Sequence, residues 1–143
     1  MVASLVSGQM LTIASAGDSR CYLVRGGELR QLTRDDSWVS AALGEGILNS
    51  DDVEHHPLRN VITKAVGARD SIDLDIVEHQ FAAGDLVLLC SDGLHGMIND
   101  QEISRILGTA SEPLEDLSAR LIDAANESGG RDNVTVVLLR LPA

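Results

Sequence analysis

The chain has 143 residues, of which 44% are hydrophobic and only 2% aromatic, so a disordered chain is excluded and an aliphatic core is expected. Its 22 acidic residues outnumber 11 basic ones, for a formal net charge of −11. This charge argues against nucleic acid or an anionic membrane surface as a partner. We expect a single domain over residues 1–143.

Sheet is predicted for the first part of the chain, where apolar residues alternate between short turns. Ser7-Gly8-Gln9 separates the first two strands, and Gly26-Gly27 forms a hairpin turn between the last two. The expected strands span residues 2–6, 10–16, 20–25 and 28–32.

Two short helices are expected next. One spans residues 37–43, and the other begins near residue 50 and stops before Pro57. His55 and His56 are adjacent and have no second ligand at metal-binding spacing, so we expect both to be exposed to solvent.

An amphipathic strand is predicted for residues 72–81, because apolar and acidic residues alternate there. The pattern places Ile72, Leu74 and Ile76 on one face and Asp73 and Asp75 on the other.

The run Leu86–Cys90 is apolar without interruption, which predicts a strand buried on both faces. Ser91-Asp92-Gly93 follows, so Asp92 lies at the rim of the core, where it can reach a cation. Asp-Gly is also a common turn pair, and that simpler reading stays open for this motif taken alone.

Two amphipathic helices and a final strand over residues 133–141 complete the chain. Asn99 and Glu102 form a capping box for the first helix, and the second starts near Pro113. The expected core faces are Ile103, Ile106 and Leu107 on the first helix, and Leu114, Leu117, Leu121, Ile122 and Ala125 on the second.

Three carboxylates lie beside apolar runs and close to glycines: Asp18, Asp92 and Asp132. We expect them to converge on one site. Hard oxygen ligands of this kind suit Mg²⁺ or Mn²⁺ rather than zinc.

With these motifs in this order, the sequence resembles the type 2C family of metal-dependent serine/threonine protein phosphatases over nearly its whole length. Each segment alone is a weak signal, whereas five in the right order and spacing are specific. The matching segments are Ala16-Gly17-Asp18-Ser19-Arg20, then Leu32-Thr33 with Asp35, then residues 59–67, then Gly84-Asp85 with residues 88–94, and finally residues 132–137.

The resemblance implies an α+β fold that forms part of a four-layer α-β-β-α sandwich with mostly antiparallel sheets. It also implies metal-dependent hydrolysis of phosphoserine and phosphothreonine in phosphoprotein substrates. No side chain is assigned as the catalytic nucleophile, because two or more Mn²⁺ or Mg²⁺ ions would activate a water molecule.

Carried over residue by residue, the resemblance makes Asp92 and Asp132 ligands of a core metal, with Gly93 and Asn133 as neighbours of the site. Asp18 matches a ligand of a third, weaker metal that also contacts Asp92. The bridging Asp-Gly pair and the phosphate-binding arginine of the family have no match here. The chain therefore resembles the C-terminal portion of a catalytic domain, and we expect activity to need upstream residues.

Other phosphatase chemistries fit the sequence less well. Asp73-Leu74-Asp75-Ile76-Val77 matches the nucleophile pattern of haloacid-dehalogenase-type phosphatases, but it follows a predicted loop rather than a buried strand. A cysteine phosphatase lacks the required arginine after Cys90. His95 could act as a general acid, although a solvent-exposed loop histidine is the simpler reading.

Three functions remain open: a piece of a working phosphatase, a non-catalytic regulatory or binding module derived from one, or a structural domain in which the Asp residues cap turns. Exposed sheet edges would favour oligomers or strand exchange. Cys21 and Cys90 are expected to be reduced and buried. The first residues carry no signal-peptide pattern, so a cytoplasmic location is expected.

Overall fold

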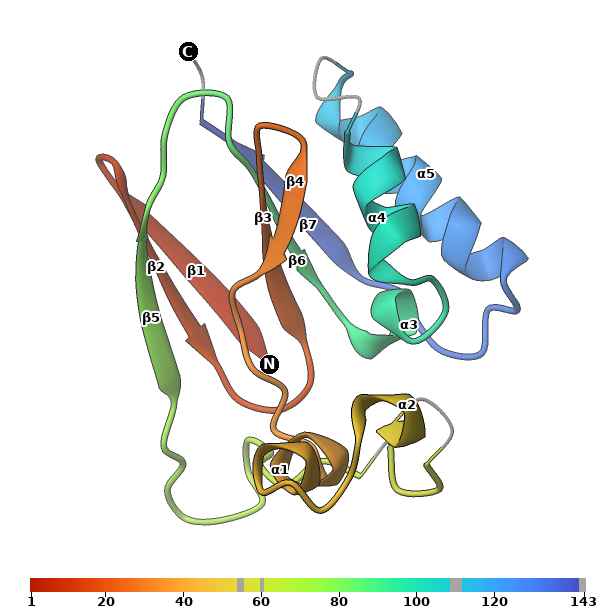
Figure 1. The fold of residues 1–143 in the computed structure, drawn as a ribbon. Helices are drawn as coiled ribbons and strands as arrows, with labels where there is room; N and C mark the ends of the chain where they lie inside the picture. Colours follow the sequence, from red (N-terminus) through yellow and green to blue (C-terminus); the bar gives the residue numbers. More distant parts are fainter. Residues whose placement is uncertain (54–55, 60, 109–111, 142–143) are drawn as a thin grey trace.

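The computed structural model describes residues 1–53, 56–59, 61–108 and 112–141. Two antiparallel sheets pack face to face, and two helices cover the outer face of one of them (Figure 1). A further pair of short helices lies beyond one end of the sheets (Figure 1). The expected α+β class with antiparallel sheets is confirmed.

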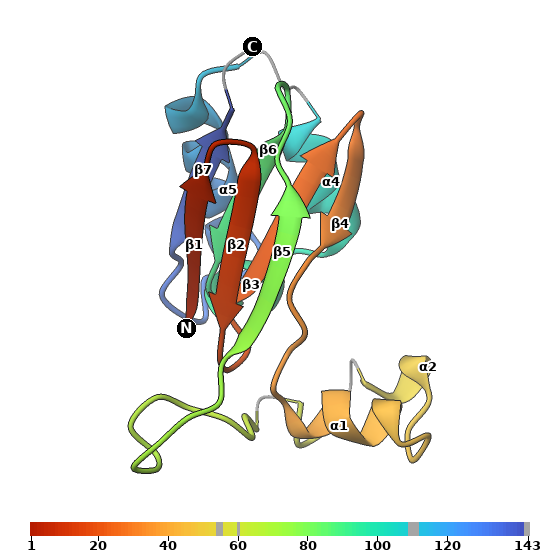
Figure 2. The same ribbon diagram turned by 90° about the vertical axis from the view of Figure 1, so that its left-hand side faces the viewer.

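The first sheet has three strands in the order β1-β2-β5. Alternation along β2 turns Leu11 and Ile13 into the core, where both are completely buried. Figure 2 shows the other face of this sheet, over which no helix in the described part of the chain packs. The strands are β1 (Val2–Ser7), β2 (Met10–Ser15) and β5 (Asp75–Gln80).

The expected orientation of β5 is wrong. Ile76 is 65% exposed, and it is Val77 that lies opposite Ile13 and packs against the core. Residues 72–74 lie outside the strand. The alternation therefore correctly predicted a strand, but the face of the strand that becomes buried depends on its register with β2.

The second sheet has four strands in the order β4-β3-β6-β7. Every residue of β6 is buried, as its uninterrupted apolar run predicted. The strands are β3 (Arg20–Arg25), β4 (Glu28–Gln31), β6 (Leu86–Cys90) and β7 (Val136–Arg140).

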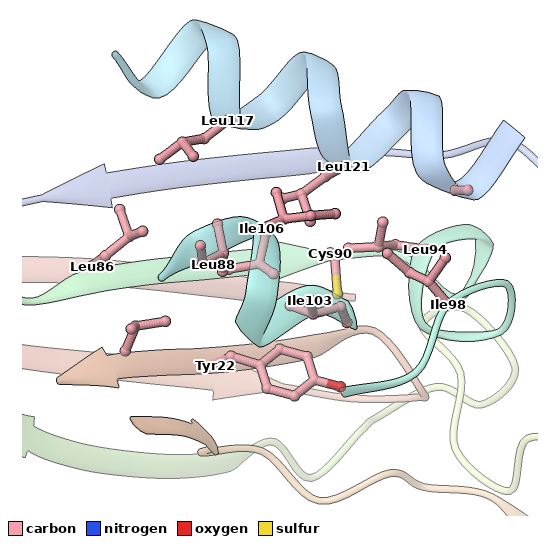
Figure 3. Packing of buried hydrophobic residues seen from close by; sticks show 13 residues of the cluster. Tyr22, Leu86, Leu88, Cys90, Leu94, Ile98, Ile103, Ile106, Leu117 and Leu121 are labelled. Atoms are coloured by element: carbon pink, nitrogen blue, oxygen red, sulfur yellow. The ribbon is translucent and has the colours of Figure 1, made fainter. Parts of the chain in front are cut away.

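Helices α4 (Asp100–Leu107) and α5 (Leu114–Glu127) cover the outer face of the four-stranded sheet. One half of the predicted capping box of α4 is confirmed, because the Asn99 side chain accepts a hydrogen bond from the Glu102 N–H at 2.9 Å, while the Glu102 carboxylate pairs with Arg105. In Figure 3 the apolar faces of the helices meet the sheet. The buried helix residues are Ile103, Ile106, Leu107, Leu117, Leu121 and Ala125.

Three shorter helices complete the fold: α1 (Trp38–Gly44), α2 (Ser50–Val53) and α3 (Asp92–His95). The Ser37 side chain caps α1 by accepting a hydrogen bond from the Ser40 N–H. The prediction that His56 is exposed to solvent is wrong, because its ring stacks on Trp38 at a centroid distance of 4.9 Å. The same expectation for His55 lies outside the described residues.

The two buried cysteines lie on opposite faces of the four-stranded sheet. Cys90 packs in the cluster under the helices, whereas Cys21 packs between the two sheets. Both thiols are free, as expected, and burial raises the pKa of each to about 12. Neither is therefore an activated nucleophile at neutral pH.

No helix among the described residues is long and apolar enough to cross a membrane.

We predict that Leu88→Ala lowers the free energy of unfolding by about 2–5 kcal/mol, because Leu88 is fully buried beneath the helices. The matched control is Ile47→Ala in the segment after α1, where the side chain is 64% exposed, and a change within about 0.5 kcal/mol is expected. Urea unfolding followed by circular dichroism measures both. Equal losses in the two variants would contradict the burial pattern described above.

Candidate metal centre

Asp92 is the first residue of α3 and directly follows the buried strand β6 and Ser91. The next residue, Gly93, packs on the backbone of Asn133, where an added Cβ would lie only 2.2 Å from the carbonyl oxygen. Only glycine allows this approach. The close packing places the start of α3 directly against the loop that carries Asp132.

Hydrogen bonds of Ser91 also join the start of α3 to the loop that carries Asp132. The Ser91 hydroxyl donates to the Asn133 carbonyl at 3.2 Å and accepts from the Thr135 N–H at 3.0 Å. The Ser91 N–H also donates to the Thr135 carbonyl. The predicted site neighbours Gly93 and Asn133 are thus the contacts that bring the Asp92 and Asp132 segments together.

Asp18 lies in the turn between β2 and β3. Gly17 has a φ of +100°, a conformation that favours glycine, and it exchanges two hydrogen bonds with Asp36. On the other side, the His95 Nε2 atom lies 3.0 Å from the Asp18 carbonyl oxygen. The turn is therefore held both by the start of the segment leading to α1 and by α3.

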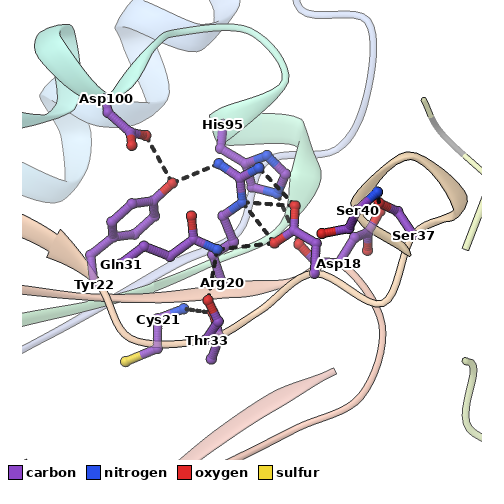
Figure 4. Close-up of polar contacts among 11 residues, drawn as sticks. Asp18, Arg20, Cys21, Tyr22, Gln31, Thr33, Ser37, Ser40, His95 and Asp100 are labelled. Atoms are coloured by element: carbon purple, nitrogen blue, oxygen red, sulfur yellow. Dashed lines mark hydrogen bonds and ion pairs between the residues drawn. The ribbon is translucent and has the colours of Figure 1, made fainter. Parts of the chain in front are cut away.

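A network centred on Arg20 lies next to this turn (Figure 4). The guanidinium group donates from Nε and Nη2 to the Asp35 carboxylate, at distances of 2.7 to 3.1 Å, and from Nη1 to the Tyr22 hydroxyl. Tyr22 in turn donates to Asp100 on α4 at 3.0 Å. Burial opposes the charge of Arg20, but its bonds to Asp35 and Tyr22 raise its pKa, so the side chain stays cationic.

His95 differs from the solvent-exposed loop histidine that the sequence suggested. It ends a helical turn and is half-buried. Burial lowers its pKa, and the Arg20 charge lowers it further, so the imidazole is neutral at pH 7. A carbonyl oxygen can only accept, so Nε2 carries the proton and donates to Asp18.

Sequence reasoning missed the roles of Asp36 and His95 in holding the Asp18 turn. Their partners are backbone atoms 19 and 77 residues away, so no local spacing signals the contacts. Asp35 lay in a matched motif, but its pairing with Arg20 was not foreseen.

The three predicted ligands differ from the other carboxylates of this region. Within the described residues, Asp18, Asp92 and Asp132 take part in no ion pair, whereas Arg20 neutralises Asp35 and Lys64 contacts Asp36 at 3.2 Å. In the described part of the chain, the carboxylates of Asp92 and Asp132 each accept one hydrogen bond, from the N–H of the next residue. Carboxylates that lack a protein cation fit the oxygen donors that Mg²⁺ or Mn²⁺ requires.

The carboxylates do not form a ready-made cage. Among the described residues, no three or more His, Cys, Asp or Glu side chains are grouped so that they could hold a metal ion. Mg²⁺ is commonly held by one or two carboxylates and several waters, so the donor set fits a partly hydrated cation. The assignment of Asp18, Asp92 and Asp132 as ligands stays a prediction.

A cleft of about 580 Å³ lies between α1 and β5. Its charged lining residues are Arg34, Asp35, Asp36, Lys64 and Asp75. Ser37, Thr63, Leu74 and Ile76 are among its other lining residues.

Comparison with known sequences identifies relatives. The chain is 41% identical over 140 residues to the protein phosphatase PhpP of Streptococcus pneumoniae, a match that covers 98% of this chain and 56% of PhpP. It is 37% identical over 139 residues to the serine/threonine phosphatase Stp of Listeria monocytogenes, covering 97% of this chain and 55% of Stp. The chain thus spans about half the length of these relatives. No protein-family model matches the sequence.

Solved structures agree with the sequence matches. The Mycobacterium tuberculosis serine/threonine phosphatase PstP superposes with a TM-score of 0.92 at 37% identity, over 99% of this chain and 59% of that chain. A PstP catalytic domain in complex with two manganese ions gives a TM-score of 0.87 at 34% identity, over 99% and 58% of the two chains. Over nearly its whole length the chain is therefore similar to part of the serine/threonine protein phosphatases of the type 2C family.

We predict that Gly93→Ala destabilises the protein by about 1–3 kcal/mol, because the added methyl group meets backbone atoms of Asn133 that cannot move independently. Gly44→Ala in α1 is the matched control, since its methyl group would meet only the tip of the Arg34 side chain. Thermal unfolding of both variants tests this. A Gly93→Ala protein as stable as Gly44→Ala would show that the two loops are not tightly packed.

Proposed function

We propose that this chain supplies part of the catalytic domain of a metal-dependent phosphatase that hydrolyses phosphoserine and phosphothreonine in proteins. The observation that carries the proposal is the fixed placement of Asp92 and Asp132, two carboxylates without a protein cation on adjoining segments. The relatives named above, which are serine/threonine phosphatases, support the same reaction.

Mn²⁺ or Mg²⁺ is the proposed cofactor, in two or more ions, which is supported by the two manganese ions bound to the related PstP domain. Asp92 and Asp132 would hold a core cation, and Asp18 a weaker one that Asp92 would also contact. When bound, such cations supply a water of lowered pKa and neutralise the phosphate charge. The chain's own residues orient these carboxylates, through Gly93 and Ser91 on one side and Asp36 on the other.

Three carboxylates are too few to complete the coordination of two cations, so water or groups beyond this chain would fill the remaining positions. No residue described here is proposed to bind the phosphate itself. Arg20 is unsuited to that role because its guanidinium is already engaged by Asp35 and Tyr22.

The second candidate function is a non-catalytic regulatory or binding module derived from such a phosphatase. One observation favours it, namely that the described residues hold no preformed group of three metal ligands. Such a module would bind a cation weakly and would not complete a hydrolytic site.

The test is a chimaera in which this chain replaces the corresponding part of the streptococcal phosphatase PhpP. We expect hydrolysis of a phosphothreonine peptide that requires Mn²⁺, and we expect Asp92→Asn and Asp132→Asn each to lower the rate by about a hundredfold or more. The matched control is Asp123→Asn, an exposed position on α5, which should leave the rate unchanged.

Calorimetric titration of the isolated chain with Mn²⁺ covers the case of a chimaera that does not fold. Binding that Asp92→Asn abolishes supports the metal site. A folded chimaera whose activity is indifferent to Mn²⁺ or to Asp92→Asn would refute the proposed reaction. Mn²⁺ binding together with an inactive, folded chimaera would favour the regulatory module.

We further propose that copies of the isolated chain associate through the uncovered face and edges of the three-stranded sheet. Leu5 and Ile76 are 66% and 65% exposed on that face, next to Met10 at 38%.

Reduced, buried Cys21 and Cys90 are consistent with the cytoplasmic location proposed for the protein.

Light scattering at increasing concentration should then give a mass above that of one chain, and the double substitution Leu5→Lys, Ile76→Lys should restore the monomer. A single monomeric species of the unsubstituted chain at every concentration would exclude this association.

A further inference from the structure

We propose that His95 is a positioning residue that couples the Asp18 turn to helix α3 and thereby sets the cation affinity of Asp18 together with Asp92. This inference rests on the proposed metal site. It assigns to His95 a role through the backbone of a ligand rather than a contact with substrate or metal.

The first support is the geometry of α3. The helix is a single turn that begins with Asp92 and ends with His95, so both side chains belong to one rigid unit. His95 Nε2 donates to the Asp18 carbonyl oxygen at 3.0 Å across 77 residues of sequence. In Figure 4 the imidazole lies beside the Arg20 guanidinium and the Asp18 turn.

The second support is how few contacts join these two segments. Among the described residues, this is the one hydrogen bond between α3 and the Asp18 turn. The backbone before Asp18 is held separately, since Asp36 binds Gly17 and Met1 exchanges two hydrogen bonds with Ala16. Without the His95 hydrogen bond, the Asp18 turn would still be held by Asp36, but its position relative to Asp92 would no longer be fixed.

The third support is the state of the imidazole. Its Nε2–H is committed to a backbone carbonyl, so this proton is not presented to a ligand or a leaving group. A hydrogen bond that fixes the main chain of a metal ligand also helps to orient the carboxylate of that ligand. In other metal sites, residues that do not touch the metal orient its ligands in this way.

The test compares His95→Gln with His95→Leu in calorimetric titrations of the chain with Mn²⁺. Glutamine places a side-chain N–H the same number of bonds from the backbone, whereas leucine fills similar space without a donor. We expect His95→Leu to weaken Mn²⁺ binding about tenfold and His95→Gln to keep an affinity close to that of the unsubstituted chain. His79→Leu on β5 controls for loss of a histidine elsewhere.

A double-mutant cycle with Asp18→Asn locates the effect. If His95 acts through Asp18, then His95→Leu should weaken Mn²⁺ binding little further once Asp18 is replaced. Circular dichroism checks that each variant folds, and the glutamine variant still decides the question if the leucine variant does not.

The outcomes separate the two proposals. Absence of Mn²⁺ binding by the unsubstituted chain overturns the metal site, and the role of His95 with it. Binding that His95→Leu leaves unchanged overturns the positioning role alone. Equal loss in the glutamine and leucine variants overturns it as well, because packing rather than the donated hydrogen bond would then matter.

Discussion

Burial of β6 on both faces is the constraint on which the rest of the structure depends. Leu86, Leu88 and Cys90 pack under the helices, while Val87 and Leu89 pack against the three-stranded sheet. A strand with no polar face can lie only between two apolar layers, so both layers are required to cover it. The same burial fixes the position of Asp92, since the chain leaves the core immediately before it. Stability and the candidate site are therefore linked through one five-residue strand.

The sequence predicted elements well where one local rule decided them. The apolar run of β6, the Asn99 cap and the apolar stripe of α5 each depend on neighbouring residues only. They agree with the structure, except that Ile122 of the α5 stripe lies outside the core cluster. Prediction from the sequence failed where the pairing of distant segments decides which side chains become buried or stacked. The face of β5 follows from its register with β2, and the stacking of His56 on Trp38 follows from how the segment after α2 returns to α1.

In the candidate site, too, some residues could be recognised from the sequence and others could not. Carboxylates near the ends of apolar runs could be recognised in the sequence, and so could the glycine that a close approach requires at position 93. The second group of residues could not be recognised, because Asp36 and His95 act on backbone atoms that only the folded chain brings near. A side chain that binds a distant backbone carbonyl leaves no periodicity and no motif in the sequence.

The charges around Asp18 explain why a carboxylate can stay available beside an arginine. Arg20 is two residues from Asp18, and in an isolated peptide the two would attract each other. In the folded chain the guanidinium is held by two-point contact with Asp35 and by the Tyr22 hydroxyl, so its donors are already engaged beside Asp18. Asp35 thus satisfies the buried cation, and Lys64 is similarly engaged by Asp36 and Asp75. Asp18, Asp92 and Asp132 are among the acidic side chains that have no ion-pair partner in the described structure, which leaves their carboxylates available for the divalent cation proposed for the site.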